Sequence, residues 1–319
     1  MSKSPFQDSP ETADPRFGGI RTFARQEQTR DLTGVDAVVV GLPFDLGTSF
    51  RPGARFGPEA IRSASVMLRP YHQVHRLDVL GDQRVVDWGD AVASPGNAER
   101  AVRQLTEQLG ELAAGGAIPL GLGGDHLVVL AELRALAARH GPLGLLLLDS
   151  HPDTWDSYGG ERYFHGTPFR RALEEGLIDP TRSLMAGMRG PLYSEEVLTE
   201  TREMGFRLLP WAELRTTSPQ RFGELARERL GSGPTFLSFD VDFVDPAFAP
   251  ATGTPEPGGP SSAEALELVR ALAGNSFAGF DVVEVSPPYD GPGQITALLA
   301  ANVAYEMLAL VMLTEHGTS

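Results

Sequence analysis

Short apolar runs of strand length alternate along this chain with segments of helical period. The run Leu143–Leu148 is almost entirely leucine and ends at a polar cluster, which is typical of a strand buried on both faces of a parallel sheet. Neighbouring parallel strands need a long crossover connection, usually a helix, and the intervening segments have the required apolar spacing. The pattern predicts an α/β fold: a three-layer α/β/α sandwich around a central, mostly parallel sheet of about eight strands.

The expected elements can be placed along the chain from these periodicities. Strands are predicted at Asp36–Gly41, Arg84–Trp88, Ala117–Leu122, Leu143–Leu148, Ser183–Ala186, Phe206–Leu209, Thr235–Phe239 and Phe280–Glu284. Helices are predicted at Pro58–Leu68, Asn97–Ala114, Leu127–His140, 194–204, 218–229, 261–273 and 295–313. We expect residues 1–30 to be an N-terminal extension and residues 31–319 to form a single catalytic domain.

Charge and composition exclude several classes of function. The chain has 42 acidic and 27 basic residues, a formal net charge of -15, which disfavours nucleic acid and anionic membranes as partners and suits a small cationic ligand. There is no cysteine, so any metal must be held by carboxylate and imidazole groups. We expect no apolar run of the length that spans a bilayer, about 20 residues, and therefore a cytoplasmic protein.

Three short polar clusters each follow a predicted strand: Gly-Gly-Asp-His at 123–126, Asp-Ser-His-Pro-Asp at 149–153, and Ser-Phe-Asp-Val-Asp at 238–242. Residues two apart on an extended chain point the same way, and ligands of parallel sheets bind at the carboxyl ends of the strands. We therefore expect these clusters to meet in one pocket. The candidate metal ligands are His126, Asp149, His151, Asp153, Asp240 and Asp242.

This donor set is large enough for two divalent ions about 3.5–4 Å apart. Four carboxylates buried together would repel one another unless cations neutralised them, which supports the same interpretation. Two such ions would lower the pKa of a water between them, so a hydrolase is expected. Mn²⁺ suits oxygen and imidazole ligands best, but Ni²⁺, Co²⁺ or Zn²⁺ would also be accepted. A mononuclear deacylase on the same fold would not require both His126 and Asp242.

The motifs closely resemble those of the ureohydrolases, the arginase and agmatinase superfamily. The resemblance extends over nearly the whole chain, through residues 17–23, 50–58, the three ligand clusters, 165–170 and 284–290. It implies a doubly wound parallel sheet, two Mn²⁺ ions per chain and hydrolysis of a linear guanidino compound to urea and an amine. It also implies a homotrimer or homohexamer.

The resemblance also assigns roles to individual residues. It implies that one ion is bound by His126, Asp149, Asp153 and Asp240, and the other by Asp149, His151, Asp240 and Asp242. His165 matches a histidine that shuttles protons near the leaving amine, and Glu284 matches a glutamate that pairs with the guanidinium group. Asp153 is counted among the catalytic residues as well as the ligands.

Simpler roles for some of these residues, and for the whole site, remain open. Glu284 could instead form a salt bridge with a structural arginine, Arg51 or Arg189. Asp125 most simply caps a helix that begins at His126. A chain that kept the ligands but had lost catalysis would be a metal-binding regulatory scaffold.

The substrate is expected to come from the agmatinase and guanidinobutyrase branch of this family. Arginases have an asparagine two residues after the third ligand of the Asp-x-His-x-Asp group, where this chain has Trp155, so arginine is disfavoured. The ammonium group of agmatine would favour Asp156 or Glu161, whereas a guanidino acid would favour Arg162 or Arg170. The acidic composition favours agmatine, with putrescine as the product.

Alternatives to agmatine are a guanidino acid of the 4-guanidinobutyrate, 3-guanidinopropionate or proclavaminate type, and free guanidine with nickel. Four departures from the family pattern keep them open: Leu127, Ser150, Pro152 and Ala251. The ligand set is unaffected by these departures.

Overall fold

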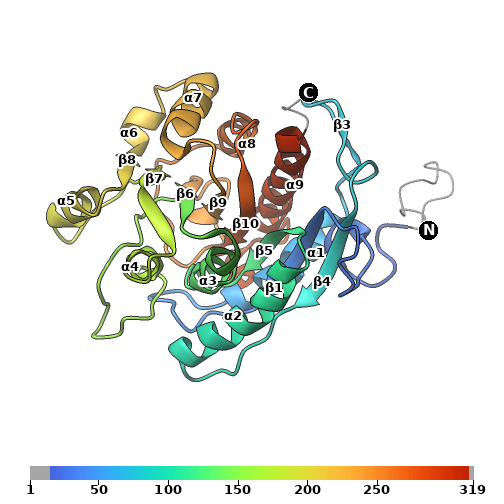
Figure 1. The fold of residues 1–319 in the computed structure, drawn as a ribbon, viewed down its shortest axis with the longest axis horizontal. Coiled ribbons are helices and arrows are strands. Elements are labelled where there is room, and N and C mark those ends of the chain that lie inside the picture. The colour runs from blue at the N-terminus through green and yellow to red at the C-terminus, as the bar shows by residue number, and fades with distance from the viewer. Residues whose placement is uncertain (1–14, 316–319) are drawn as a thin grey trace.

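The computed structural model describes residues 15–315 and contains one large sheet (Figure 1). Its strands follow the order β4-β1-β5-β10-β9-β6-β7-β8, and every neighbouring pair is parallel. Their bounds are β1 Ala37–Leu42, β4 Val85–Asp90, β5 Ile118–Gly123, β6 Leu143–Leu148, β7 Ile178–Ala186, β8 Arg207–Leu209, β9 Thr235–Asp240 and β10 Phe277–Val283. The predicted α/β/α sandwich with a parallel, eight-stranded sheet is confirmed.

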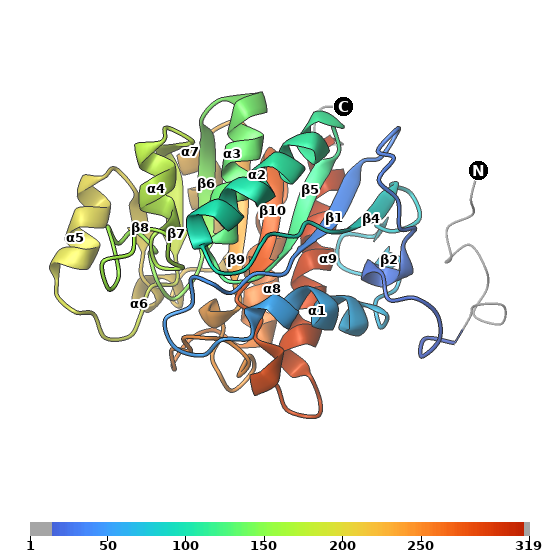
Figure 2. The ribbon, with the colours of Figure 1, turned by 90° about the horizontal axis from the view of Figure 1, so that it is seen from below.

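Helices cover both faces of this sheet (Figure 2). One layer contains α2 (Ala98–Ala114), α3 (Val128–His140) and α4 (Pro168–Glu174). The other contains α1 (Gly57–Ser65), α6 (Trp211–Leu214), α7 (Pro219–Leu230), α8 (Ser262–Arg270) and α9 (Ile295–Glu315). Helix α5 (Glu196–Glu203) lies at the β8 edge, and short 3-10 helices occupy Phe23–Arg25, Ala54–Phe56, Val241–Phe243 and Pro287–Tyr289.

Successive side chains of the central strands enter opposite layers. Leu145 and Leu147 of β6 pack with α2 and α3, whereas Leu146 and Leu148 pack with the helices of the other face. Because the two faces of a strand alternate along the chain, a strand covered on both sides must be apolar at every position. This accounts for the leucine-rich sequence of β6.

Some elements were not anticipated from the sequence. Strand β7 begins at Ile178, five residues before the predicted start at Ser183, and the short helices α4 and α6 were not predicted. A two-stranded antiparallel hairpin, β2 (Tyr71–His72) and β3 (Leu77–Asp78), was also missed. The helices α4 and α6 and the two strands of the hairpin are too short to show a clear apolar period.

Helix α9 corrects the expectation that no apolar run has the length of a membrane span. Ile295–Thr314 has that length and composition, but 83% of the best window is buried inside the structure. A helix that is apolar on all sides is one that is surrounded by protein or by lipid, and here its neighbours are α1, α8, β5 and β10. Its composition reflects its place in the core.

The segment before the sheet is partly integrated with it. Phe23 and Ala24 are completely buried, and the Phe23 backbone N–H donates to the Asp87 carboxylate at 2.7 Å. Residues 1–14 of the predicted N-terminal extension lie outside the described residues. The division between extension and catalytic domain at residue 30 stays a prediction.

Candidate metal centre and substrate cavity

Four neighbouring strands bring the candidate side chains to one edge of the sheet. Strands β5, β10, β9 and β6 lie side by side in that order, and their carboxyl ends meet because all are parallel. β5 leads to His126, β10 to Glu284 and β6 to Asp149, while β9 ends at Asp240. Side chains from distant parts of the sequence are therefore close together.

The turn after β5 requires a residue without a side chain. A Cβ atom at Gly124 would lie 2.5 Å from the carbonyl oxygen of Leu42 and 2.7 Å from that of Phe44. Such distances are not compatible with the present backbone. The glycine lets the chain pass close to the end of β1 and place His126 over the sheet edge.

The first group of potential ligands surrounds His126. Its Nδ1 atom lies 3.2 Å from Asp149 Oδ2 and 3.3 Å from Asp240 Oδ2. Asp153 Oδ2 is 2.9 Å from the same nitrogen. Among residues 15–315, no well-formed hydrogen bond satisfies Nδ1 or Asp149 Oδ2, although both are buried. Unsatisfied buried donors and acceptors are costly, and a cation among them would remove the cost.

The second group shares Asp149 and adds His151 and Asp242. His151 Nδ1 lies 3.1 Å from Asp242 Oδ2 and 3.6 Å from Asp149 Oδ1. The potential ligand atoms of His126, Asp149 and Asp240 lie within 4.8 Å of one another, and so do those of Asp149, His151 and Asp242. Asp149 thus faces both groups, while Asp240 faces the first and accepts the Asp242 backbone N–H at 2.8 Å. The bridging role expected of Asp240 stays a prediction.

The carboxylates of this centre oppose one another electrostatically. Burial and the neighbouring carboxylates raise the pKa of Asp240 well above its usual value, and burial together with Asp149 raises the pKa of Asp153 to about 6. Burial alone would raise the pKa of Asp149, but the neighbouring His126 and His151 rings, 3.2 and 3.6 Å from its oxygens, lower it. Cations would relieve the remaining repulsion, so the donors present fit a pair of divalent metal ions.

A chain of hydrogen bonds behind His126 selects its tautomer. His126 Nε2 lies 2.9 Å from Ser238 Oγ, and the Ser238 hydroxyl donates to Asp281 Oδ1 at 2.6 Å. Since that hydroxyl proton goes to Asp281, Ser238 accepts the proton on Nε2, and Nδ1 keeps a lone pair toward the carboxylates. Sequence reasoning missed Ser238 and Asp281, although Ser238 stands two residues before a candidate ligand.

His165 lies at the edge of the centre between Glu284 and Ser49. Its Nδ1 atom is 2.9 Å from Glu284 Oε1, and its Nε2 atom is 2.7 Å from Ser49 Oγ. Burial lowers the pKa of His165, but the charge of Glu284 and its hydrogen bond more than compensate and raise the pKa to about 9. The Ser49 backbone N–H, 3.1 Å from Nε2, favours an unprotonated Nε2. The His165 ring is therefore held between the Glu284 carboxylate and the Ser49 hydroxyl group. Both the neutral and the protonated ring can form hydrogen bonds with these two groups.

Glu284 has no arginine partner among residues 15–315, so the salt bridge with Arg51 or Arg189 is not formed. Its Oε1 atom accepts the backbone N–H of His126 at 2.9 Å in addition to its bond with His165. Arg189 donates to backbone carbonyl oxygens instead, and the guanidinium of Arg51 lies 5.3 Å from the Tyr289 ring centre. Glu284 Oε2 is buried without a partner among the described residues. That oxygen is available to a ligand.

Asp125 does not cap a helix beginning at His126, contrary to the prediction. Helix α3 begins at Val128 and has no side-chain cap. Asp125 accepts the backbone N–H of Leu127 at 3.0 Å and that of Gly47 at 2.7 Å. Its carboxylate therefore ties the loop after β1 to the loop after β5.

Two residues of the centre adopt left-handed backbone conformations that residues with a side chain rarely adopt. Asp153 has φ 50° and Glu284 has φ 64°. Strain of this kind costs about 1–3 kcal/mol and persists where the surroundings hold the residue in place. Both residues direct carboxylates toward His126 or His165.

The departures from the family pattern have distinct surroundings. Ser150 donates its hydroxyl to Asp242 Oδ1 at 2.6 Å, a bond that an alanine would lack. Leu127 is completely buried in the core and has no contact with the cavity described below. Pro152 lines that cavity. Ser150 and Pro152 are thus the departures that lie within reach of ligands or substrate.

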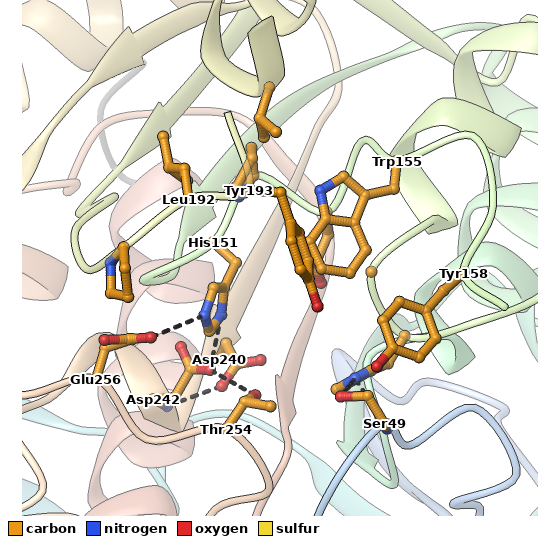
Figure 3. Close-up of a pocket in the computed structure, with 16 residues that line it drawn as sticks. Ser49, His151, Trp155, Tyr158, Leu192, Tyr193, Asp240, Asp242, Thr254 and Glu256 are labelled. Carbon is orange, nitrogen blue, oxygen red and sulfur yellow. Dashed lines mark hydrogen bonds and ion pairs between the residues drawn. The ribbon is translucent and has the colours of Figure 1, made fainter. Parts of the chain in front are cut away.

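A cavity of about 340 Å³ opens onto His151, Asp153, Asp240 and Asp242 (Figure 3). This volume is within the range for small-molecule sites. Its far wall consists of aromatic side chains: Trp155 is stacked on Tyr158, with ring centres 5.7 Å apart, and is tilted against Tyr193.

The one acidic lining residue outside the predicted ligand set is Glu256, on the side opposite the aromatic rings. Its Oε1 atom lies 3.9 Å from His151 Nε2. Sequence reasoning did not identify Glu256, because it follows no strand and stands alone in a loop.

The charged residues expected to select the substrate do not line this cavity. Arg162 is paired with Glu174 at 2.7 Å, and Arg170 is paired with Glu200 at 2.9 Å. Asp156 is paired with an arginine of α4, and neither Asp156 nor Glu161 is among the lining residues. No lining residue of this described cavity is an arginine or lysine.

Comparison with known proteins identifies close relatives over almost the full length. Residues 35–309 match the model of the arginase family. The chain is 43% identical over 300 residues to a guanidinobutyrase of Pseudomonas aeruginosa, covering 93% of this chain and 94% of the relative. It is 44% identical to a guanidinopropionase of the same organism (95% and 96%) and 42% identical to a mitochondrial agmatinase of Gallus gallus (92% and 86%).

Solved structures agree with these relationships. Proclavaminate amidinohydrolase from Streptomyces clavuligerus superposes with a TM-score of 0.90 at 41% identity, covering 94% of this chain and all of that one. A formiminoglutamase of Trypanosoma cruzi determined with Mn²⁺ gives a TM-score of 0.80 at 26% identity, covering 90% and 96%. The expected kinship is confirmed: this chain belongs to the arginase family, in the branch of amidinohydrolases that act on guanidino compounds.

Proposed function

We propose that this amidinohydrolase hydrolyses agmatine to putrescine and urea with the help of two Mn²⁺ ions. The observation that carries the choice of agmatine is the lining of the described cavity, which offers the carboxylate of Glu256 and aromatic rings but no arginine or lysine. An acidic, aromatic wall suits a substrate whose far end is an ammonium group.

The proposed ligands are those that converge at the sheet edge. His126 and Asp153 would hold one ion, His151 and Asp242 the other, and Asp149 and Asp240 would contact both. Two bound cations would lower the pKa of a water and stabilise negative charge on the oxygen that attacks the guanidine carbon. Ni²⁺, Co²⁺ and Zn²⁺ remain alternatives to Mn²⁺ because the same donors accept them.

Glu284 would orient the substrate, and His165 would transfer a proton. The unpartnered Oε2 atom of Glu284 would accept a hydrogen bond from the guanidinium group and orient it. His165 would deliver a proton to the amine that leaves when the C–N bond breaks. Water adds its oxygen to the guanidine carbon, so urea and protonated putrescine are formed without a net change in bound protons.

The far end of the substrate would lie between the aromatic wall and Glu256. A cation over an aromatic ring gains about 0.5–2 kcal/mol, depending on how far it is desolvated. Trp155 provides a ring where arginases provide an amide, which supports a substrate without an α-carboxylate.

A guanidino acid is the second candidate, because two of the close relatives are a guanidinobutyrase and a guanidinopropionase. Its carboxylate would need a basic partner, and Arg162 and Arg170 are already engaged in ion pairs. Either arginine would have to leave its glutamate to bind such a substrate. This makes the acid the less favoured candidate.

Turnover of a substrate panel tests the proposal. Enzyme loaded separately with Mn²⁺, Ni²⁺, Co²⁺ and Zn²⁺ is given agmatine, 4-guanidinobutyrate, 3-guanidinopropionate, arginine and free guanidine, and urea is measured. We expect the highest kcat/KM for agmatine with Mn²⁺. A clear preference for an acid or for guanidine would overturn the choice of agmatine, and no urea from any combination would favour the regulatory scaffold.

The assembly and location of the enzyme belong to the same proposal. We propose a homotrimer or homohexamer, on the strength of the resemblance to ureohydrolases, and a cytoplasmic location. Light scattering of the purified protein measures the first, and cell fractionation measures the second.

A further inference from the structure

A pair of buried carboxyl groups lies behind the first metal group. Asp281 of β10 accepts the Ser238 hydroxyl, and Glu132 of α3 reaches the same place from the helix layer above the sheet. Asp281 is completely buried, and Glu132 is 3% exposed. Neither carboxyl group faces the substrate cavity. Two acids in the core need a physical reason to be there.

The position of Glu132 is fixed by a glycine on the neighbouring strand. Gly121 of β5 is the direct partner of Asp281 in the pairing of β5 with β10. A Cβ atom added to Gly121 would lie only 2.2 Å from Glu132 Oε1, so the glutamate occupies the space that a side chain at this position would fill. The missing side chain thus allows the Glu132 carboxyl group to lie against the sheet beside Asp281.

The carboxyl groups of Glu132 and Asp281 must share a proton. Among residues 15–315, no N–H or hydroxyl group donates to either oxygen of Glu132 or to Asp281 Oδ2. Two ionised carboxylates in contact would repel each other, whereas a protonated one donates a hydrogen bond to the other. Burial, followed by the charge of Asp281, raises the pKa of Glu132 well above its usual value, and Asp281 is the partner of the resulting hydrogen bond.

We infer that Glu132 is a positioning residue for the metal ligand His126, and that it acts by carrying the proton shared with Asp281. With the proton on Glu132, Asp281 remains a pure acceptor and takes the Ser238 hydroxyl proton. Ser238 then accepts from His126 Nε2, and His126 Nδ1 stays free to bind a cation. The inference rests on the proposed metal centre, but not on the identity of the substrate.

If the shared proton lay on Asp281 instead of Glu132, His126 would be unable to bind a metal ion through Nδ1. If Asp281 carried it, Asp281 could donate to Ser238, and the Ser238 hydroxyl would turn toward His126 Nε2. His126 would then hold its proton on Nδ1, where no metal can bind. Groups of this kind behind a metal ligand typically change metal affinity by about 10–100-fold when replaced.

Metal titration of variants tests the inference. Glu132→Gln keeps a donor that can face Asp281, whereas Glu132→Leu keeps the volume and removes the donor. A matched control is Glu306→Gln, which alters a buried glutamate of α9 held by Arg270 and His72. Mn²⁺ binding to each metal-free variant is measured by calorimetry in competition with a chelator.

We expect Glu132→Leu to lose about 10–100-fold in affinity for one of the two ions. Glu132→Gln and Glu306→Gln should bind both ions within a few-fold of the unmodified protein. Unchanged affinity in Glu132→Leu would overturn the inference, and so would an equal loss in Glu132→Gln, because a negative charge rather than a proton donor would then be required.

A second measurement is independent of how well Glu132→Leu folds. In metal-loaded protein the infrared absorption of protonated carboxyl groups should lose a band on Glu132→Gln substitution, and persistence of the full absorption would contradict the inference. Protein that binds two ions as described but hydrolyses no guanidine would refute the proposed function alone.

Discussion

Replacing Glu284 with glutamine removes a buried negative charge beside His165 while it keeps the size and shape of the side chain. The charge of Glu284 and its 2.9 Å hydrogen bond outweigh the effect of burial and, with Asp153 and Asp125, raise the pKa of His165 from 6.5 to about 9. At about 1.4 kcal/mol per pKa unit, this corresponds to roughly 3 kcal/mol that favours the protonated ring.

The expected result of Glu284→Gln is a lower pKa of His165. A hydrogen bond to a charged group contributes about 1.5–3 kcal/mol, so we expect the pKa to fall by about 1–2 units. Because the folded-state pKa is raised, His165 contributes its stabilisation fully below pH 6.5 and loses it as the pH rises through about 9. In Glu284→Gln the free energy of unfolding should fall by a smaller amount over this titration, and the fall should occur at lower pH.

NMR titration of the His165 ring in metal-free protein measures this change, and thermal unfolding of the same protein between about pH 6 and pH 10 measures its effect on stability. Glu256→Gln serves as a control, since Glu256 lines the same cavity but approaches His151 instead of His165. If the pKa of His165 were the same in Glu284→Gln and in the unmodified protein, the charge of Glu284 would not be what raises the pKa of His165.

Substitutions in the turn after β5 and in the cavity wall have distinct expected effects. Gly124→Ala should lower the free energy of unfolding by about 1–3 kcal/mol because its Cβ would collide with the Leu42 carbonyl. Gly110→Ala, inside α2 and with free space around it, should raise the free energy of unfolding by up to about 1 kcal/mol. Chemical denaturation of both variants measures these changes. Trp155→Ala should raise the KM for agmatine by roughly 2- to 30-fold with a smaller change in kcat, and steady-state urea release would show otherwise if KM stayed constant. Glu256→Arg should shift the preference from agmatine toward 4-guanidinobutyrate, and an unchanged ratio of the two kcat/KM values would count against a role for Glu256 in recognition.

The strands and the long helices could be predicted because their periodicity is strong. The predicted strand Leu143–Leu148 has the observed bounds, since a leucine-rich run of strand length that ends at a polar segment is typical of a strand covered on both faces. The start of β7 at Ile178 was missed because Asp179, Pro180 and Thr181 interrupt the apolar pattern where the strand is only half-buried. Short elements such as α4 depend on the loop before them, which local sequence does not reveal.

The convergence of the polar clusters could also be anticipated, because each follows a parallel strand. The order of the strands could not, and it is this order that places Glu284 of the β10 end between the β5 and β9 clusters. Residues that act through three-dimensional contact alone, such as Glu132, Ser238 and Glu256, carry no local pattern. Only their burial and their hydrogen bonds in the folded structure identify them.

The number of divalent ions per chain decides whether the centre is binuclear. Protein loaded with Mn²⁺, freed of excess metal and analysed for metal content should contain two ions per chain, and Asp242→Asn should retain only the ion held by His126 after the same treatment. A single ion in the unmodified protein, or two equally tight ions in Asp242→Asn, would contradict the binuclear centre and the hydrolysis proposed to occur there.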